Sequence, residues 1–204
     1  MCGIVAYTGK REASPILING LRLLEYRGYD SAGMFLAGRG AFKAVGPVNN
    51  LAKKLEKLSD SFSSKAGISH TRWATHGMPS IANAHPHSDQ FGKVWIVHNG
   101  IIENHKELKR EMIGLGYKFV SETDSEVVAH LIVDNLKRVK TIEEAVNQTL
   151  KKLIGTYGLA IMHDGEPSKI IAARMGSPLV VGLGQGENFI ASDISAVIHH
   201  THKV

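Results

Sequence analysis

Strand-like segments at both ends of the chain, with helices between them, restrict its fold more than any other feature. These runs lie near residues 4–7, 32–36, 41–45, 67–71 and 94–98 and, after the helices, near 157–163, 169–173, 179–182 and 188–191. Turns such as Gly38-Arg39-Gly40 and Asp164-Gly165 separate neighbouring runs, which favours antiparallel hairpins. The pattern predicts an α+β fold in which layered sheets have helices packed outside.

Helix-start signals place the helices. Ser14 followed by Pro15 predicts an N-cap and first helical position near the N-terminus. Apolar spacing from Leu51 to Phe62 predicts a short amphipathic helix. Three helices follow, opened by Asn104 with Glu107, by Thr123 with Glu126 and by Thr141 with Glu144, the last two pairs having capping-box spacing. We expect them to end near Gly114, Leu136 and Leu153.

Composition excludes several classes of protein. The 204 residues, 43% of them hydrophobic, suit one domain spanning 1–204 without linker or repeat. The net charge of +5 comes from basic residues interleaved with acids, as in Lys53–Lys57, so nucleic acid is not expected as a partner. No apolar run is long enough for a membrane span, no signal peptide is recognisable, and a single cysteine suits a reducing compartment. We therefore expect a cytoplasmic protein that does not associate with membranes.

The single cysteine, Cys2, has an unusual chemical option. Removal of Met1 would make it an N-terminal residue that carries both a thiol and a free α-amine. That amine has a pKa of roughly 7.7 to 8.0, so near neutral pH it can accept the thiol proton. Gly3 leaves the approach to the thiol open. Cys2 alone is weak support, because small residues often follow an initiator methionine.

Other polar residues beside predicted strands supply what an amino-acid substrate needs. Arg72 suits an α-carboxylate, and Asp124 suits an ammonium group. The Asn99 side chain and the Gly100 N–H could donate to an oxyanion. Each has a simpler interpretation: Arg72 could pair with a surface acid, Asp124 could cap a helix, and Asn99-Gly100 could form a type I′ turn. Their joint presence favours the functional interpretation.

The segments that carry these residues resemble the class II glutamine amidotransferases, and among them the glucosamine-6-phosphate synthase branch. The matching segments are Met1–Val5, Leu24–Gly33, His70–Gly77, Asn83–His87, Val97–His105 and Ser121–Asp124. Tyr29-Asp30 before Ser31 is similar to the sugar-phosphate branch rather than to the purine-pathway enzymes. The resemblance implies an N-terminal-nucleophile hydrolase fold, a four-layer αββα sandwich with two antiparallel sheets between helical layers.

The resemblance also implies roles for individual residues. Cys2 would be nucleophile and base, and Asn99 with Gly100 would form the oxyanion hole. Substrate-binding roles are implied for Arg72 at the carboxylate, for Asp124 at the ammonium, for Trp73 on the ammonia's exit route, and for Thr75, His76 and Gly100 in the pocket. Arg27 and Gly28 would support the surroundings of the nucleophile.

The resemblance further implies a substrate and partners. The substrate would be L-glutamine, hydrolysed through a thioester without a cofactor to give glutamate and ammonia. The resemblance implies sugar-isomerase domains as partners. Nothing in these residues is similar to such domains, so they are expected C-terminal to this chain in a longer protein. The chain as given would then act as a glutaminase, and a homodimer is compatible with the sequence.

Three alternative functions are compatible with parts of the sequence. The His85–His87 and His199–His202 clusters invite a metal site, but no Cys, Asp or Glu has suitable spacing, and no metal is expected. His70, His76 and His98 fit better as hydrogen-bonding residues. Gly182–Gly186 is similar to a nucleotide-binding loop, but no helix pattern follows, so a turn is expected. A regulatory module that binds glutamine without reacting stays open, and Cys2 distinguishes it from an enzyme.

Overall fold

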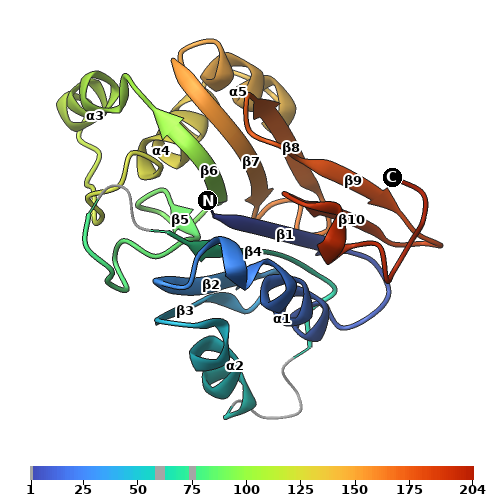
Figure 1. Ribbon diagram of the computed structural model, residues 1–204. Helices are drawn as coiled ribbons and strands as arrows, with labels where there is room; N and C mark the ends of the chain where they lie inside the picture. The colour runs from blue at the N-terminus through green and yellow to red at the C-terminus, as the bar shows by residue number, and fades with distance from the viewer. Residues whose placement is uncertain (1, 58–62, 74–76) are drawn as a thin grey trace.

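Two antiparallel sheets face each other between two layers of helices, as the sequence predicts (Figure 1). The computed structural model describes residues 2–57, 63–73 and 77–204. The larger sheet has the order β3-β2-β4-β1-β10-β9, with β1 (Gly3–Thr8), β2 (Ser31–Leu36), β3 (Gly40–Val45), β4 (Ala66–Arg72), β9 (Val180–Leu183) and β10 (Asn188–Ala191). The smaller has the order β5-β6-β7-β8, with β5 (His87–Ser88), β6 (Val94–Ile102), β7 (Gly155–His163) and β8 (Ile170–Met175).

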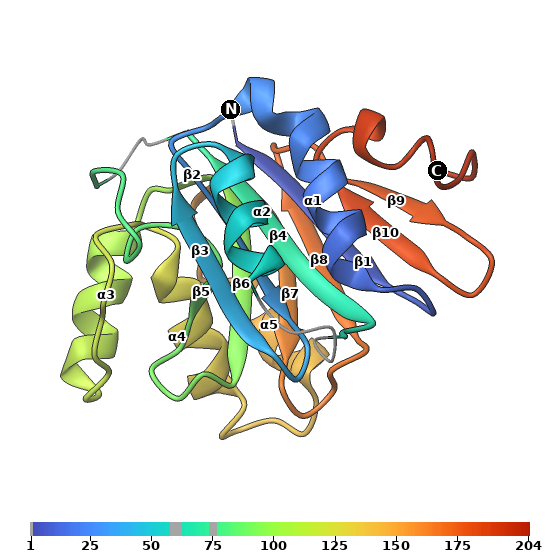
Figure 2. The ribbon, with the colours of Figure 1, turned by 90° about the horizontal axis from the view of Figure 1, so that it is seen from below.

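The helices cover the outer faces of both sheets. Two of them, α1 (Ala13–Leu24) and α2 (Val48–Glu56), lie across the larger sheet (Figure 2). The smaller sheet is covered by α3 (His105–Gly114), α4 (Glu126–Asn135) and α5 (Ile142–Leu150). Short 3-10 helices follow α1 and β10, namely η1 (Glu25–Arg27) and η2 (Ile194–Ala196). The predicted continuation of α2 to Phe62 falls on residues 58–62, outside the described residues.

Alternation along β1 shows how the layers are held together. Val5 and Tyr7 pack in the cluster beneath α1 and α2, while Ile4 and Ala6 pack between the two sheets. All four are at most 1% exposed. Successive side chains of a strand point to opposite faces, so a strand buried on both faces has to be apolar throughout. The first strand therefore lies in the centre of the sandwich.

The helix starts correct several capping predictions. The residue before α1 is Glu12, not Ser14, and its carboxylate accepts the Ser64 backbone N–H at 3.2 Å. Neither Asn104 nor Thr123 caps a helix with its side chain. Tertiary partners outcompete the local bonds: the Asn104 amide donates to the Lys152 carbonyl at 2.8 Å.

The capping box of α5 is confirmed. The Thr141 side chain accepts the Glu144 N–H at 3.2 Å, and the Glu144 carboxylate accepts the Lys140 N–H at 3.1 Å. The helix ends at Leu150, three residues before the expected Leu153. Both groups of this box are exposed, so no buried partner competes for them.

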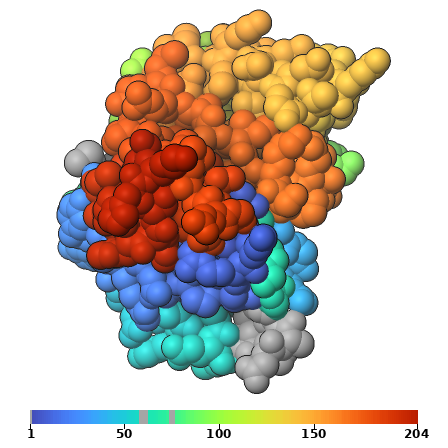
Figure 3. Space-filling view, turned by 90° about the vertical axis from the view of Figure 1, so that its right-hand side faces the viewer, coloured from blue at the N-terminus to red at the C-terminus, as the bar shows by residue number. Residues whose placement is uncertain are grey.

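The end of the chain returns to its beginning. β10 pairs antiparallel with β1, with Ala191 opposite Val5, and the space-filling view shows the C-terminal residues (red) against the N-terminal ones (blue) (Figure 3). The expected turn at Gly182–Gly186 joins β9 to β10, where the Gly184 N–H donates to the Glu187 carbonyl at 2.8 Å. The residues that follow β10 are thereby brought next to those that precede β1.

Candidate functional site

Sheet register places Cys2 beside the end of β4. Gly3 of β1 is opposite Thr71 of β4, so the residue before one strand is adjacent to the residues that end the other. The Cys2 Sγ accepts the Trp73 N–H at 3.2 Å and lies 3.6 Å from the Trp73 carbonyl oxygen. Burial raises the pKa of the Cys2 thiol, although the Trp73 N–H opposes this shift. At neutral pH the sulfur therefore keeps its proton and needs a base to become a nucleophile.

Asn99 and Gly100 lie within strand β6, which excludes the type I′ turn. They pair with Gly158 and Tyr157 of β7. The Asn99 Nδ2 donates to the Cys2 carbonyl at 3.0 Å, so one amide hydrogen fixes the backbone of Cys2 and the other remains for a ligand. Gly100 has φ of +127°, a conformation that only glycine adopts readily.

His70 holds the Asn99 side chain in this orientation. Its Nε2 lies 3.0 Å from both the Asn99 Oδ1 and the His98 carbonyl oxygen, two acceptors that require Nε2 to carry the proton. Complete burial lowers the pKa of His70 to about 3, despite the raising effect of these two bonds. His70 is therefore a neutral donor whose bond turns the Asn99 amide nitrogen toward Cys2. The prediction that it serves as a hydrogen-bonding residue is confirmed.

A polar cavity adjoins the sulfur. It has about 300 Å³ of empty space. Its walls come from five segments that are separate in sequence, and comprise Cys2, Arg72, Trp73, His85, His98, Gly100, Thr123, Asp124 and Ser125.

Two opposite charges face this cavity. Arg72, 4% exposed, donates from Nη2 to the Gly77 carbonyl at 3.1 Å. Burial lowers its pKa, while Cys2, Asp30 and Asp124 counter the shift. Asp124, 5% exposed, accepts the Ile102 N–H at 2.7 Å and lies within 3.3 Å of the Ser125 hydroxyl. A zwitterion with its carboxylate at Arg72 and its ammonium at Asp124 would match this arrangement.

A second cavity also borders Cys2. It has about 590 Å³ of empty space and is lined by Cys2, Arg27, Trp73, Asn99, Gly100, Ser177 and Pro178. The Arg27 guanidinium is tied to the chain after β10, through Asp193 at 2.6 Å and the Ser192 carbonyl at 3.3 Å. A Cβ on Gly28 would lie 2.8 Å from the Arg72 carbonyl carbon and the Trp73 nitrogen. The absence of a side chain at Gly28 thus lets η1 close against the end of β4.

Of the other residues predicted to line the pocket, Trp73 lies beside the sulfur, and two fall outside the described part of the chain. Trp73 borders both cavities and is 46% exposed, in edge contact with Tyr29 at 5.9 Å. Thr75 and His76 lie outside the described residues. Four further residues line the polar cavity that the sequence did not predict as part of the pocket, namely His85, His98, Thr123 and Ser125.

Two of these wall residues had a signal in the sequence. Thr123 and Ser125 flank Asp124, which was already a candidate. His85 comes from a distant loop, so only the tertiary structure shows its position. Within residues 2–57, 63–73 and 77–204, no three His, Cys, Asp or Glu side chains are grouped to hold a metal ion. No helix in that part of the chain is long and apolar enough to cross a membrane.

The arrangement of groups around the Cys2 thiol limits the reactions that the site can catalyse. The Cys2 thiol borders both a polar cavity and a second, more apolar one, and an amide donor is fixed beside it. Attack of the sulfur on a carbonyl carbon in the polar cavity would place the new oxyanion near Asn99 and Gly100. This arrangement suits acyl transfer from an amide of an amino acid.

Sequence comparison gives concordant results. A glutamine amidotransferase domain family matches residues 70–199. The chain is 51% identical to a glutamine–fructose-6-phosphate aminotransferase (isomerizing) of Chlorobaculum tepidum over its whole length, and 48% identical to the Pyrococcus horikoshii protein of that name. It spans 34% of the length of each of these relatives.

Comparison with solved structures agrees. Glutamine phosphoribosylpyrophosphate amidotransferase from Bacillus subtilis, complexed with ADP and GMP, superimposes with a TM-score of 0.81 at 28% identity, covering 98% of this chain and 44% of that one. A glutamine aminotransferase class-II domain protein from Silicibacter pomeroyi has a TM-score of 0.61 at 15% identity, over 94% of this chain and 86% of that one, a likeness of fold alone. With the family match and the relatives' identity, the chain belongs to the glutamine amidotransferase domain family.

Proposed function

We propose that this chain hydrolyses L-glutamine to glutamate and ammonia, with Cys2 as the nucleophile. The observation that supports it best is that Cys2, Arg72, Gly100 and Asp124 line the same polar cavity. Arg72 would bind the α-carboxylate and Asp124 the α-ammonium, leaving the side-chain amide directed at the sulfur. Trp73, Thr75 and His76 complete the proposed pocket, and Arg27 with Gly28 supports it.

The proposed reaction has two steps. Once Met1 is removed, the Cys2 α-amine takes the thiol proton, and the sulfur attacks the amide carbon of glutamine. Asn99 and the Gly100 N–H stabilise the oxyanion, the C–N bond breaks as the proton passes to the nitrogen, and ammonia leaves a thioester. Water then adds to the thioester carbon and releases glutamate and the thiol. The raised pKa of the thiol makes the amine base necessary.

The larger setting follows from the relatives. Because the chain spans 34% of the length of its curated relatives, we propose that it works with C-terminal sugar-isomerase domains that use the ammonia to aminate fructose 6-phosphate. Trp73, which borders both cavities, would lie on the route of the ammonia. We also propose a cytoplasmic homodimer, without nucleic acid or membrane as a partner.

Release of ammonia from glutamine tests the proposal. Intact mass identifies chains without Met1, and we expect those alone to release ammonia and glutamate. Cys2→Ala should abolish release while glutamine still binds, as measured by calorimetry. Glutamine binding without turnover by the processed wild-type chain would instead establish a regulatory module. Full turnover by Cys2→Ala would refute the role of the sulfur.

A further inference from the structure

A third cavity lies at the side of the sandwich where both sheets end. It has about 900 Å³ of empty space, which is within the range of small-molecule sites. Edge strands β3 and β5 form two of its sides. The charged and aromatic side chains that line it are Lys43, Lys54, His87, Asp89, Trp95 and Glu126. We call it the edge pocket.

Lys43 projects into the edge pocket from β3. Its neighbours Phe42 and Ala44 pack beneath the helices, while Ala41 packs between the sheets. Strand alternation therefore directs Lys43 to the same side as Ala41. Among the residues that the structure describes, its ammonium has no hydrogen bond and no ion pair. Burial lowers the pKa of Lys43 to about 8, although Glu126 acts to raise it.

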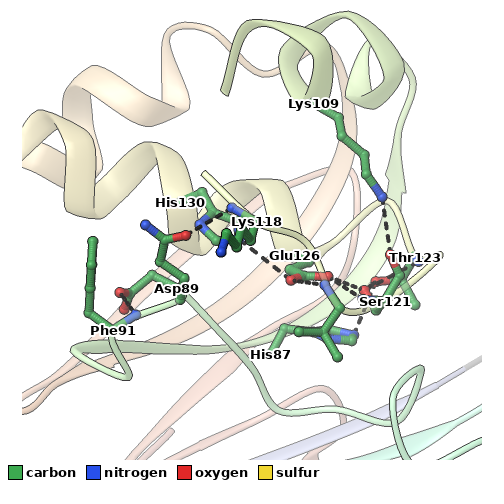
Figure 4. Close-up of polar contacts among 11 residues, drawn as sticks. His87, Asp89, Phe91, Lys109, Lys118, Ser121, Thr123, Glu126 and His130 are labelled. Carbon is green, nitrogen blue, oxygen red and sulfur yellow. Dashed lines mark hydrogen bonds and ion pairs between the residues drawn. The ribbon is translucent and has the colours of Figure 1, made fainter. Parts of the chain in front are cut away.

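The carboxylates of the edge pocket already have partners. Glu126 accepts the N–H groups of Val120 at 2.8 Å and Ser121 at 2.6 Å, and also the Ser121 hydroxyl (Figure 4). Although burial raises its pKa, these bonds together with that from His130 hold the pKa of Glu126 at about 2.

Asp89 is bound in the same way. It accepts three backbone N–H groups, from Phe91, Lys93 and Val94, at 2.7 to 2.8 Å. Both carboxylates are therefore directed at protein donors, while the Lys43 ammonium is directed at open space. The half-buried Lys43 ammonium, which no acceptor in the described part of the chain contacts, is available to form a charge-assisted hydrogen bond with an incoming anion.

A second ammonium reaches the edge pocket around the edge of the sheet. Lys54 of α2 donates to the Lys43 carbonyl at 3.2 Å, which holds its charge beside β3. The apolar part of the lining comes from Ala41, Ile81, Ala82, Trp95 and Val120. We propose that the edge pocket binds a small organic anion, whose charged group contacts Lys43 and whose carbon skeleton lies against this apolar lining.

The edge pocket and the candidate active site share a wall. The His87 Nε2, on the edge-pocket side, lies 3.1 Å from the Thr123 hydroxyl, which borders the polar cavity (Figure 4). His87 also contacts the ring of His85, another wall residue of that cavity, with centroids 4.4 Å apart. An anion at Lys43 thus changes the affinity for glutamine, a consequence that rests on the proposed function.

Binding is tested by calorimetry with inorganic phosphate and with succinate, at constant ionic strength. We expect saturable one-to-one binding of at least one of them in the millimolar range. Lys43→Met should weaken it at least roughly tenfold, whereas Lys53→Met, an equal change of charge on the exposed face of α2, should not. Comparison of the two probes identifies the preferred charged group.

The outcomes are separable. No saturable binding of either probe up to about 50 mM, or equal binding by the wild-type and Lys43→Met chains, would overturn the site. If the glutamine KM of the wild-type chain does not respond to a saturating anion, the coupling is wrong and the site stands. Absence of glutaminase activity without any anion would instead count against the proposed function, since the binding measurement does not depend on it.

Discussion

Replacing Gly100 of strand β6 with Ala should destabilise the protein strongly, because the change meets two costs. With φ of +127°, an alanine there is strained by about 1–3 kcal/mol. Its Cβ would also lie 2.1 Å from the Thr156 carbonyl oxygen and 2.7 Å from its carbon, which are backbone atoms of the paired strand β7. Overpacking of this kind adds about 1–3 kcal/mol, so the total is about 2–6 kcal/mol.

Gly38→Ala is the matched control. Gly38 has φ of +72°, but a Cβ there meets nothing within 4 Å, so only the strain of about 1–2 kcal/mol applies. Urea unfolding followed by tryptophan fluorescence gives the unfolding free energy of each variant, and Trp95 on β6 reports directly on the affected sheet. A difference below about 0.5 kcal/mol between the two variants would refute the clash between β6 and β7.

Three further predictions concern charge. Arg72→Ala should raise the glutamine KM far more than it lowers kcat, and steady-state kinetics showing a change in kcat alone would contradict a binding role. Glutaminase activity should fall below about pH 7 as the Cys2 amine is protonated, so a flat profile down to about pH 5 would exclude the amine as base. Glu126→Gln should cost about 1.5–3 kcal/mol at neutral pH, since the pKa of Glu126 is depressed to about 2. That stability is present above about pH 4.5 and is lost as the pH falls through the folded-state pKa of about 2, so the urea midpoints of variant and wild type should converge near pH 2.

The local sequence determined those helices and strands whose capping and turn residues make no competing tertiary contacts. Apolar runs separated by Gly-containing turns predicted the strands. Thr141 with Glu144 predicted the start of α5. Asn104 and Thr123 had similar signals, but their side chains bind residues elsewhere in the fold. A capping bond contributes about 1 kcal/mol, so a partner supplied by the tertiary structure readily replaces it.

For the candidate site, the sequence supplied the reactive residues and the fold supplied their relation. Cys2, Arg72 and Asp124 could be predicted as site residues because the type of each residue already indicates the chemistry that it can perform. Asn99 and Gly100 could equally have formed a turn, and only pairing with β7 decided between the two. The contact of His70 with Asn99, and the open space in front of Lys43, exist only where separate strands meet. The sequence shows which reactions each side chain can take part in. The burial and orientation of those side chains depend on atoms that the fold brings together from distant positions in the chain.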